Sequence, residues 1–358
     1  MSTQTPNIIN ETCADPTLKT GLGVGYKHNY NKIIIIAIVI IILTIIQFGI
    51  NLIVYKKIYS NLSKYGLSTK ERPSKQLEIS EIIVENTSTR EVCPLIPPKL
   101  FGRLNFFNDS LTFEEMEEQF SWLEPGGRHK PEECLSRNKV AIVVPYRNRD
   151  RHLRIFLYNI HPMLERQQLD YGVYIVEQDG DEKFNRAKLF NVGFLEALKH
   201  YDYQCFIFHD IDLIPEDDRN LYTCPESERP RHMTVAVEQF GYGILYEEIF
   251  GGVTALTTEQ FKRINGFSNE FWGWGGEDDD LYNRVIYYGY NITRYPAEIA
   301  RYKSLEHEIA SPNPDRIDKL RDGEQRYKTD GINSIKYNLL EQVNEKLYTW
   351  ILVGLGSP

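Results

Sequence analysis

The chain divides into regions that differ in hydrophobic pattern. Residues 33–55 form an uncharged, isoleucine-rich run with lysines at both ends, long enough to cross a bilayer as one helix. Residues 56–92 are mostly polar and lack apolar periodicity, which is typical of a stem. Short apolar runs and helical patterns begin near Cys93. We therefore predict a cytoplasmic tail (1–32), a transmembrane helix (33–55), a stem (56–92) and a folded domain (93–358).

A cleaved signal peptide is the alternative to this membrane anchor. The segment before the apolar run spans residues 1–32, and the run itself is longer than the ~7–15 residue core of a signal peptide. The sequence therefore favours an anchor. Because lysines flank the run on both sides, the positive-inside rule does not decide its orientation. Whether two copies pair as a homodimer through the span stays open.

The folded domain alternates between two hydrophobic periods. Residues 140–144 are a β-branched run, and apolar residues follow at helical spacing between 153 and 160. The strand pattern returns at 171–176, the helical pattern at 187–198, and a third apolar run starts at Cys205. Strands that alternate with helices in this way predict an α/β fold with a parallel sheet.

Composition narrows the class of partner. The 358 residues are 42% hydrophobic, which is enough for a sizeable core. The formal net charge is -9 and the sequence pI is near 5.5, and no basic patch is visible. Binding to nucleic acid phosphates needs such a patch, so we expect no nucleic-acid partner.

Cysteines and sequons indicate the compartment. Cys13 precedes the predicted span and four cysteines follow it, an even number that suits two disulfides in an oxidising compartment. Reduced, buried thiols are the alternative. Sequons begin at Asn61, Asn86, Asn108 and Asn291 and also fit a luminal side. We therefore predict a single-pass type II membrane protein whose folded domain faces a secretory lumen.

The first candidate site segment is the loop at residues 145–150. It follows the first predicted strand, and open α/β sheets bind ligands at the carboxyl ends of their strands. Arg147 and Arg149 could clamp phosphates bidentately, with Tyr146 stacking on a base. In isolation, two arginines more often mark a solvated loop.

The second candidate segment is Asp210-Ile-Asp212, which directly follows the third apolar run. Alternation along an extended chain places the two carboxylates on one side. Such a pair suits a hard divalent cation that would neutralise a leaving diphosphate. Acidic residues also end strands for structural reasons, so the pair gains weight only from the arginine loop before it and the acids after it.

The third candidate segment, residues 272–280, reads Trp-Gly-Trp-Gly-Gly-Glu-Asp-Asp-Asp. Trp272 and Trp274 offer flat faces for a sugar ring, and the glycines permit tight turns close to a ligand. The four carboxylates offer acceptors for hydroxyl groups and at least one general base. The alternative is an acidic first turn of the helix that starts near Asp280, stabilised by the helix dipole.

Together these segments resemble the β-1,4-galactosyltransferase family, which includes the β-1,4-N-acetylgalactosaminyltransferases. The resemblance runs from Cys93 to the C-terminus and rests on five motifs in the family's order. They are Val-Pro-Tyr-Arg-Asn-Arg (144–149), Phe-Asn-Arg-Ala-Lys (184–188), Asp-Ile-Asp-Leu-Ile-Pro (210–215), Phe-Gly-Gly-Val (250–253) and the block at 272–280.

The resemblance implies a Golgi type II enzyme with a GT-A-like, Rossmann-like fold that uses Mn²⁺ and a UDP-sugar. Such an enzyme inverts the donor's α linkage to a β1,4 product on terminal GlcNAc. It implies that UDP contacts Pro145, Tyr146, Arg147, Arg149, Phe184, Asp210 and Ile211. It also implies metal ligands at Asp212 and His307, and disulfides that join Cys93 to Cys134 and Cys205 to Cys224.

For the reacting sugars, the resemblance implies that Asp278 is the base for the acceptor's 4-hydroxyl. Glu277 and Gly252 would lie at the donor sugar, Trp274 would be the stacking platform, and Asp279 would contact the acceptor's N-acetyl group. The acetyl pocket would be formed by Arg316, Ile317 and Leu320. A lone histidine such as His307 is more often a surface or core residue, but its polar surroundings suit a loop that closes over substrate.

Two positions depart from the family pattern. Three residues before His307, where the family usually has a methionine ligand, the chain has Ser304. A hydroxyl or a water is a harder donor than a thioether, so metal preference could shift from Mn²⁺ toward another divalent ion. At Ile249 the vertebrate galactosyltransferases have a tyrosine that faces the donor's C2 substituent. A shorter aliphatic side chain leaves room for an N-acetyl group.

The sequence therefore predicts a membrane-anchored inverting glycosyltransferase that transfers GalNAc from UDP-GalNAc to terminal GlcNAc. Transfer of galactose from UDP-Gal is the alternative donor specificity. A sugar-binding adhesion protein without turnover and a purely structural membrane protein are alternatives of other classes. The base at Asp278 and the pair at Asp210 and Asp212 argue against both, because neither class needs a base and a metal pair together.

Overall fold

The computed structural model describes residues 90–357 except 110 and 309–311. The predicted tail and transmembrane helix, and the predicted stem up to residue 89, lie outside the described residues. Within them, no helix is both long and apolar enough to span a bilayer. The chain separates into two units, residues 1–85 and 86–358, and the fold below is that of the second.

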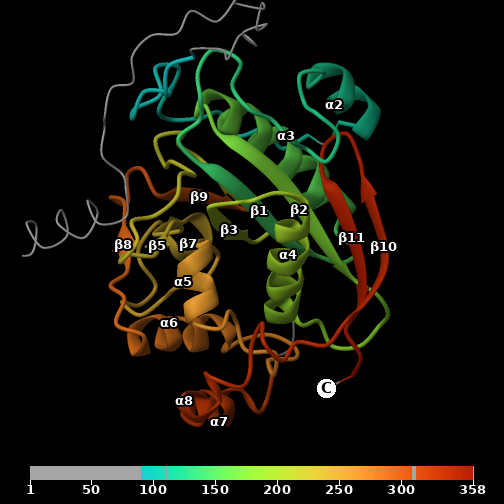
Figure 1. The fold of residues 1–358 in the computed structure, drawn as a ribbon, viewed down its shortest axis with the longest axis vertical. Coiled ribbons are helices and arrows are strands. Elements are labelled where there is room, and N and C mark those ends of the chain that lie inside the picture. Colours follow the sequence, from blue (N-terminus) through green and yellow to red (C-terminus); the bar gives the residue numbers. More distant parts are fainter. Residues whose placement is uncertain (1–89, 110, 309–311, 358) are drawn as a thin grey trace, which may run out of the picture. The chain divides into compact units, whose positions relative to one another are not determined.

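An eight-stranded mixed sheet forms the centre of this unit, in the order β10-β11-β2-β1-β3-β7-β5-β8 (Figure 1). β11, β2, β1 and β3 run parallel to one another, whereas β7 is antiparallel to β3 and β10 to β11. The strands are β1 (Lys139–Tyr146), β2 (Asp170–Gln178), β3 (Cys205–His209), β5 (Arg231–His232), β7 (Val253–Thr257), β8 (Thr293–Arg294), β10 (Asn338–Asn344) and β11 (Thr349–Gly354). The α/β fold predicted from the sequence is confirmed.

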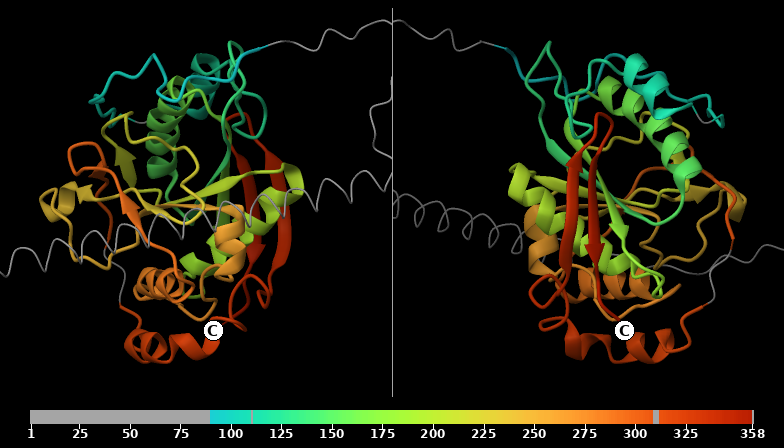
Figure 2. Two further views of the ribbon diagram at one scale, coloured as in Figure 1. Left: turned by 60° about the vertical axis from the view of Figure 1, so that its left-hand side comes forward. Right: turned by 90° about the vertical axis from the view of Figure 1, so that its right-hand side faces the viewer.

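Two long helices cover opposite faces of the sheet, as the right-hand view of Figure 2 shows: α3 (Asp150–Arg166) and α4 (Arg186–His200). Alternate residues of β1 explain the arrangement, because successive side chains of a strand point to opposite faces. Ile142 packs in the core cluster that contains the apolar face of α3, and Val143 packs in the cluster with α4. Both faces of β1 are therefore buried, as a central parallel strand requires.

Shorter elements complete the unit around this core. A second sheet has three strands in the order β4-β9-β6. Its strands are β4 (Leu213–Pro215), β6 (Ala236–Val237) and β9 (Arg301–Ser304), and the other helices are α2 (Phe113–Gln119), the 3₁₀ turn η1 (Glu238–Phe240), α5 (Thr258–Arg263), α6 (Glu277–Tyr287), α7 (Arg316–Arg321) and α8 (Gly323–Arg326). The structure contains both disulfides that the resemblance implies, Cys93–Cys134 and Cys205–Cys224.

Two expected boundaries differ from the structure. Pro145 does not end the first strand, because β1 continues through it to Tyr146. The helix of the acidic block begins at Glu277 rather than at Asp280. Gly276 precedes it with φ 97°, a left-handed conformation that glycine adopts at little cost. All four acids therefore occupy the first turn of α6, where the helix dipole favours negative charge.

Candidate functional site

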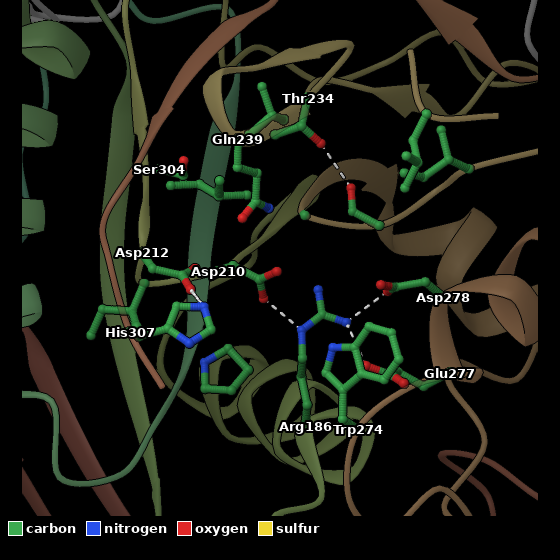
Figure 3. A pocket seen from close by; sticks show the side chains of 18 of the residues that line it. Arg186, Asp210, Asp212, Thr234, Gln239, Trp274, Glu277, Asp278, Ser304 and His307 are labelled. Atoms are coloured by element: carbon green, nitrogen blue, oxygen red, sulfur yellow. Dashed lines mark hydrogen bonds and ion pairs between the residues drawn. The ribbon is translucent and has the colours of Figure 1, made fainter. Parts of the chain in front are cut away.

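One cavity of about 700 Å³ brings the three candidate segments together (Figure 3). Its walls come from the end of β1, the β3–β4 turn, the loop before β7, the turn before α6 and the end of β9. Most residues expected to bind substrates line it: Pro145, Arg147, Arg149, Phe184, Asp210, Ile211, Asp212, Ile249, Gly252, Trp274, Glu277, Asp278 and His307.

Five expected site residues do not line this cavity. The Tyr146 side chain packs against the core cluster that contains α3, so the structure offers no support for stacking of this ring on a base. Asp279 lies beside the cavity. It accepts a hydrogen bond (2.8 Å) from the hydroxyl of Tyr246, and Tyr246 lines the cavity. Helix α7 begins at Arg316 and also contains Ile317 and Leu320. None of these three residues lines the cavity.

The two tryptophans differ, although the sequence suggested the same use for both. The indole of Trp272 is 7% exposed and packs in the core cluster with α4, where the Lys188 ammonium lies 5.0 Å from its ring centre. Trp274 is 55% exposed. Only Trp274 therefore presents an open face on which a sugar could stack.

Arg186, the first residue of α4, is the centre of the site. Its guanidinium donates to Asp210 Oδ1 (2.5 Å), Asp278 Oδ1 (2.6 Å) and Glu277 Oε1 (3.3 Å). Figure 3 shows these dashed contacts crossing the cavity from the metal-motif side to the acidic block. A fixed guanidinium can hold several carboxylates at once. Arg186 is the arginine of the motif Phe-Asn-Arg-Ala-Lys (184–188), for which the sequence alone predicted no role.

Burial and mutual repulsion raise the pKa values of two acids beside Arg186, Glu277 and Asp210. Burial, followed by the neighbouring charge of Asp278, raises the pKa of Glu277 to about 7. Burial also raises the pKa of Asp210 to about 7, against the attraction of Arg186. One cation thus compensates three carboxylates incompletely. Glu277 Oε2 is buried without a hydrogen-bond partner among the described residues, so this oxygen is available to a ligand hydroxyl.

Asp212 and His307 meet on the opposite wall. His307 Nε2 lies 2.8 Å from Asp212 Oδ2, and Arg149 Nη1 lies 3.3 Å from the same oxygen. Burial opposes ionisation of Asp212, but the His307 hydrogen bond and the Arg149 charge outweigh it and lower its pKa. The hydrogen bond that His307 donates to the Asp212 carboxylate raises the pKa of His307. The Ser304 side chain lines the cavity beside them.

The donor set at this wall suits a divalent cation of intermediate hardness. A carboxylate and an imidazole are ligands that Mn²⁺ accepts, and here the two groups lie 2.8 Å apart in the cavity wall. In the described part of the chain, no group of three or more His, Cys, Asp or Glu side chains is arranged to hold a metal. Two side chains fit the ion, and its remaining ligands have to come from elsewhere.

The loop before β7 packs directly on the acidic block. At Gly251 a Cβ atom would overlap the Asp278 carboxylate, so only glycine permits this approach. Trp274 is linked to the segment before α7, because Asn313 N–H donates to the Trp274 carbonyl (2.8 Å). The Arg316 side chain packs where a Cβ of Gly275 would lie, directly behind the turn that carries Trp274.

Comparison with known proteins gives this site a family. The model for the N-terminal region of glycosyl transferase group 7 matches residues 93–225, and that for the N-terminal domain of galactosyltransferase matches residues 231–308. Mus musculus β-1,4-galactosyltransferase 1 is 44% identical over 293 residues, which cover 80% of this chain and 73% of the relative. The chain belongs to the β-1,4-galactosyltransferase family. It is a hexosyltransferase of that family.

Other relatives and solved structures agree. Cricetulus griseus β-1,4-galactosyltransferase 4 is 45% identical over 285 residues, covering 77% of this chain and 82% of the relative. The catalytic domain of Drosophila β-1,4-galactosyltransferase 7 in complex with xylobiose has a TM-score of 0.54 at 27% identity, covering 62% of this chain and 95% of that one. A mutant of the same enzyme, with a TM-score of 0.53, is in complex with manganese, UDP-Gal and xylobiose. The expected GT-A-like catalytic fold is therefore confirmed.

Proposed function

We propose that this β-1,4-galactosyltransferase family member transfers galactose from UDP-Gal to the 4-hydroxyl of a terminal GlcNAc, with inversion. The observation that carries the proposal is the placement of Asp278 across one cavity from Asp210 and Asp212, with Arg186 between them (Figure 3). A base on one wall and a diphosphate site on the other are what in-line displacement requires. The galactosyltransferase relatives support UDP-Gal as the donor better than the UDP-GalNAc expected from the sequence.

In this mechanism the Asp278 carboxylate removes the proton of the acceptor's 4-hydroxyl. The hydroxyl oxygen bonds to the anomeric carbon from the face opposite UDP, the bond from that carbon to the β-phosphate oxygen breaks, and UDP leaves. The configuration inverts from α to β. Glu277, with its unpartnered Oε2, accepts a donor-sugar hydroxyl, and Trp274 stacks on the sugar.

UDP would lie between the ends of β1 and β3. Arg147 and Arg149 line the cavity there, and guanidinium groups suit phosphates. The Arg147 guanidinium lies 5.2 Å from the centre of the Phe184 ring. The same wall also contains Pro145, Asp210 and Ile211. A divalent metal held by Asp212 and His307 would neutralise charge on the leaving diphosphate, and the diphosphate and water would supply its other ligands.

On the acceptor side, Asp279 and the α7 residues Arg316, Ile317 and Leu320 would contact the N-acetyl group from beyond Trp274. The exposed Ile317 and half-buried Leu320 offer an apolar patch for its methyl group. We further propose a Golgi localisation, with a single-pass type II anchor at 33–55 and a luminal catalytic domain, as the disulfides and the family suggest.

The proposal is tested by turnover. The purified chain with Mn²⁺, UDP-Gal and a GlcNAc acceptor should release UDP and form a β1,4-linked disaccharide. Nuclear magnetic resonance of the product gives both the linkage and the anomeric configuration. UDP-sugar binding without UDP release, over a range of GlcNAc-terminated acceptors, would favour a sugar-binding adhesion protein instead.

Transfer of GalNAc is the second candidate function, and Ile249 favours it. This residue is half-buried and lines the cavity near Gly251 and Asp278. A branched aliphatic side chain presents no hydroxyl to the donor and is shorter than the tyrosine found in vertebrate relatives. A pocket that neither clashes with an N-acetyl group nor bonds a C2 hydroxyl discriminates weakly against UDP-GalNAc.

We expect Ile249→Tyr to lower the ratio of kcat/KM for UDP-GalNAc to that for UDP-Gal at least tenfold. The phenol would fill space that the N-acetyl group needs, and tenfold corresponds to about 1.4 kcal/mol. Ile249→Val, which keeps an aliphatic group, should change the ratio less than threefold. Equal ratios in the wild type and the tyrosine variant would mean that residue 249 does not contact the donor's C2 substituent.

Ser304 allows a test of the metal wall. We expect Ser304→Met to lower the Mn²⁺ concentration for half-maximal activity several-fold relative to the Mg²⁺ concentration, because a thioether is a softer ligand than a hydroxyl. Metal titrations of the two proteins at fixed UDP-sugar would measure this ratio. An unchanged ratio would place residue 304 outside the metal's coordination shell.

A further inference from the structure

The loop between η1 and β7, residues 241–252, has no regular secondary structure, yet it forms much of the donor side of the cavity. Tyr246, Ile249, Gly251 and Gly252 all line the cavity from this loop. Irregular loops hold a fixed shape only where their backbone groups are bonded to a rigid neighbour. Residues 247–251 therefore need such a bonded neighbour.

A single arginine on the edge strand holds two of the loop's carbonyls. Arg294, in β8, donates through Nη2 to the carbonyl of Glu247 (2.7 Å) and to that of Ile249 (2.9 Å). Its Nε donates to Nδ1 of His232 (3.1 Å). His232 lies directly beside Arg294 as its register partner in β5, so the two side chains start from paired backbone positions.

His232 continues the chain of bonds to the other end of the loop. The imidazole is fully buried, and burial, aided by the charge of Arg294, lowers its pKa to about 3. It is therefore neutral, and because Nδ1 accepts from Arg294, the proton is on Nε2. Nε2 lies 3.0 Å from Thr234 Oγ1 and 3.2 Å from the Gly251 carbonyl.

Thr234 is the last side chain in this series of hydrogen bonds, which ends at the Gly251 carbonyl. Its hydroxyl donates to the Gly251 carbonyl (2.8 Å) and accepts from the Val253 N–H (3.1 Å). The donors and acceptors thus run in one direction, from Arg294 through His232 and Thr234 to Gly251. Networks in which each member is satisfied are rigid, and they specify one geometry.

We propose that Arg294 is a positioning residue for donor selection: with His232, it fixes residues 247–251 and so sets the depth of the pocket at Ile249. The effect extends to the base, because Gly251 packs against the Asp278 carboxylate without room for a Cβ. A shift of this loop changes the room at the donor's C2 substituent and the spacing to Asp278 together. This inference rests on the proposed transferase function.

The test replaces Arg294 by lysine, which keeps the charge but cannot donate to two carbonyls and an imidazole from two fixed nitrogens, as Nη2 and Nε of Arg294 do. We expect the ratio of kcat/KM for UDP-GalNAc to that for UDP-Gal to change at least fivefold. The Kd for UDP should stay within twofold, since Arg147 and Arg149 belong to another wall. Arg263→Lys is the matched control, because Arg263 is exposed on α5, lies 5.3 Å from the centre of the Tyr290 ring and does not line the cavity. This control should leave the ratio unchanged.

Each outcome decides the proposal. An unchanged donor ratio in Arg294→Lys overturns it, even if the overall rate or the melting temperature falls, because a merely structural role predicts that pattern. If the wild type transfers neither sugar, the proposed function fails, and the ratio of Kd values for UDP-Gal and UDP-GalNAc then tests the loop by itself. If Arg294→Lys shows no cooperative melting, His232→Asn replaces it. Asparagine keeps an acceptor near the Nδ1 position but loses the bond to Thr234, so a smaller change of the ratio is expected and an unchanged one contradicts the proposal.

Discussion

Asp278→Asn should reduce kcat about 10²–10⁴-fold, the usual contribution of a general base. Asparagine has nearly the shape of aspartate and retains an oxygen that can accept from Arg186, which lies 2.6 Å from Asp278 Oδ1 in the wild type. The fold and the diphosphate wall are therefore expected to survive. A loss confined to kcat, with the Kd for UDP unchanged, would mean that the residue acts in the chemical step and not in donor binding.

Two further aspartates serve as controls for this substitution. Asp279→Asn, one residue along α6, should raise the KM for the acceptor more than it lowers kcat, because Asp279 faces Tyr246 beside the cavity. Asp202→Asn removes an exposed partner of Lys139. Asp202 does not line the cavity, so this substitution should change neither kcat nor the KM for the acceptor. Full activity in Asp278→Asn would assign the base to another group, with Glu277 as the next candidate.

The parts of the site that lie at strand ends could be predicted from the sequence. The arginine loop follows β1 and the Asp-Ile-Asp motif follows β3, and these strands are parallel neighbours. Carboxyl ends of parallel strands meet at one edge of a sheet, so local patterns were sufficient to bring Arg149 and Asp212 together. The 3.3 Å contact between them is a consequence of that topology.

The parts that depend on distant segments could not be predicted in this way. Arg186 bonds Asp210, 24 residues away, and Asp278, 92 residues away, and no periodicity in the sequence reports such pairs. The same limit explains Trp272. Its pattern matches that of Trp274, but its burial depends on how α4 packs against the turn before α6, which is a property of the assembled fold.

The acid run shows how two interpretations of one pattern can both hold. All four carboxylates are in the first turn of α6, where a structural role alone would place them. Their environments then separate them. Asp280 is buried and pairs with Arg284 (2.6 Å), whereas Glu277 and Asp278 turn to Arg186 and the cavity. The run of acids is visible in the sequence, but only the packing of the folded chain shows that Asp280 has a structural partner whereas Glu277 and Asp278 face the cavity.

Arg186→Met should destabilise the protein by roughly 3–5 kcal/mol at pH 8, the usual cost of leaving buried charges without their partner. The Arg186 side chain is only 16% exposed, and it is the shared cation for Asp210, Glu277 and Asp278. Methionine is of similar length and has no charge. Turnover should fall as well, because the guanidinium holds Asp278 in place across the cavity.

The destabilisation should depend on pH with a definite sign. The pKa of Glu277 is about 7 in the folded wild type, above its usual value of ~4.3 in an unfolded chain. A group with a raised folded pKa favours the folded state most below its unfolded pKa and loses that contribution as pH rises through the folded value. Removing the cation that Glu277 and Asp210 share raises the pKa values of these two acids further, which deepens the loss at high pH.

We therefore expect the difference in melting temperature between the wild type and Arg186→Met, measured without metal or UDP, to be clearly larger at pH 8 than at pH 5. Protonation of Glu277 and Asp210 at pH 5 removes most of the repulsion that the variant exposes. Arg229→Met is the control, because the Arg229–Glu226 pair is largely exposed and such pairs contribute little. A difference that is the same at both pH values would mean that Arg186 stabilises the fold through packing on Phe190, 4.7 Å from its guanidinium, and not through charge.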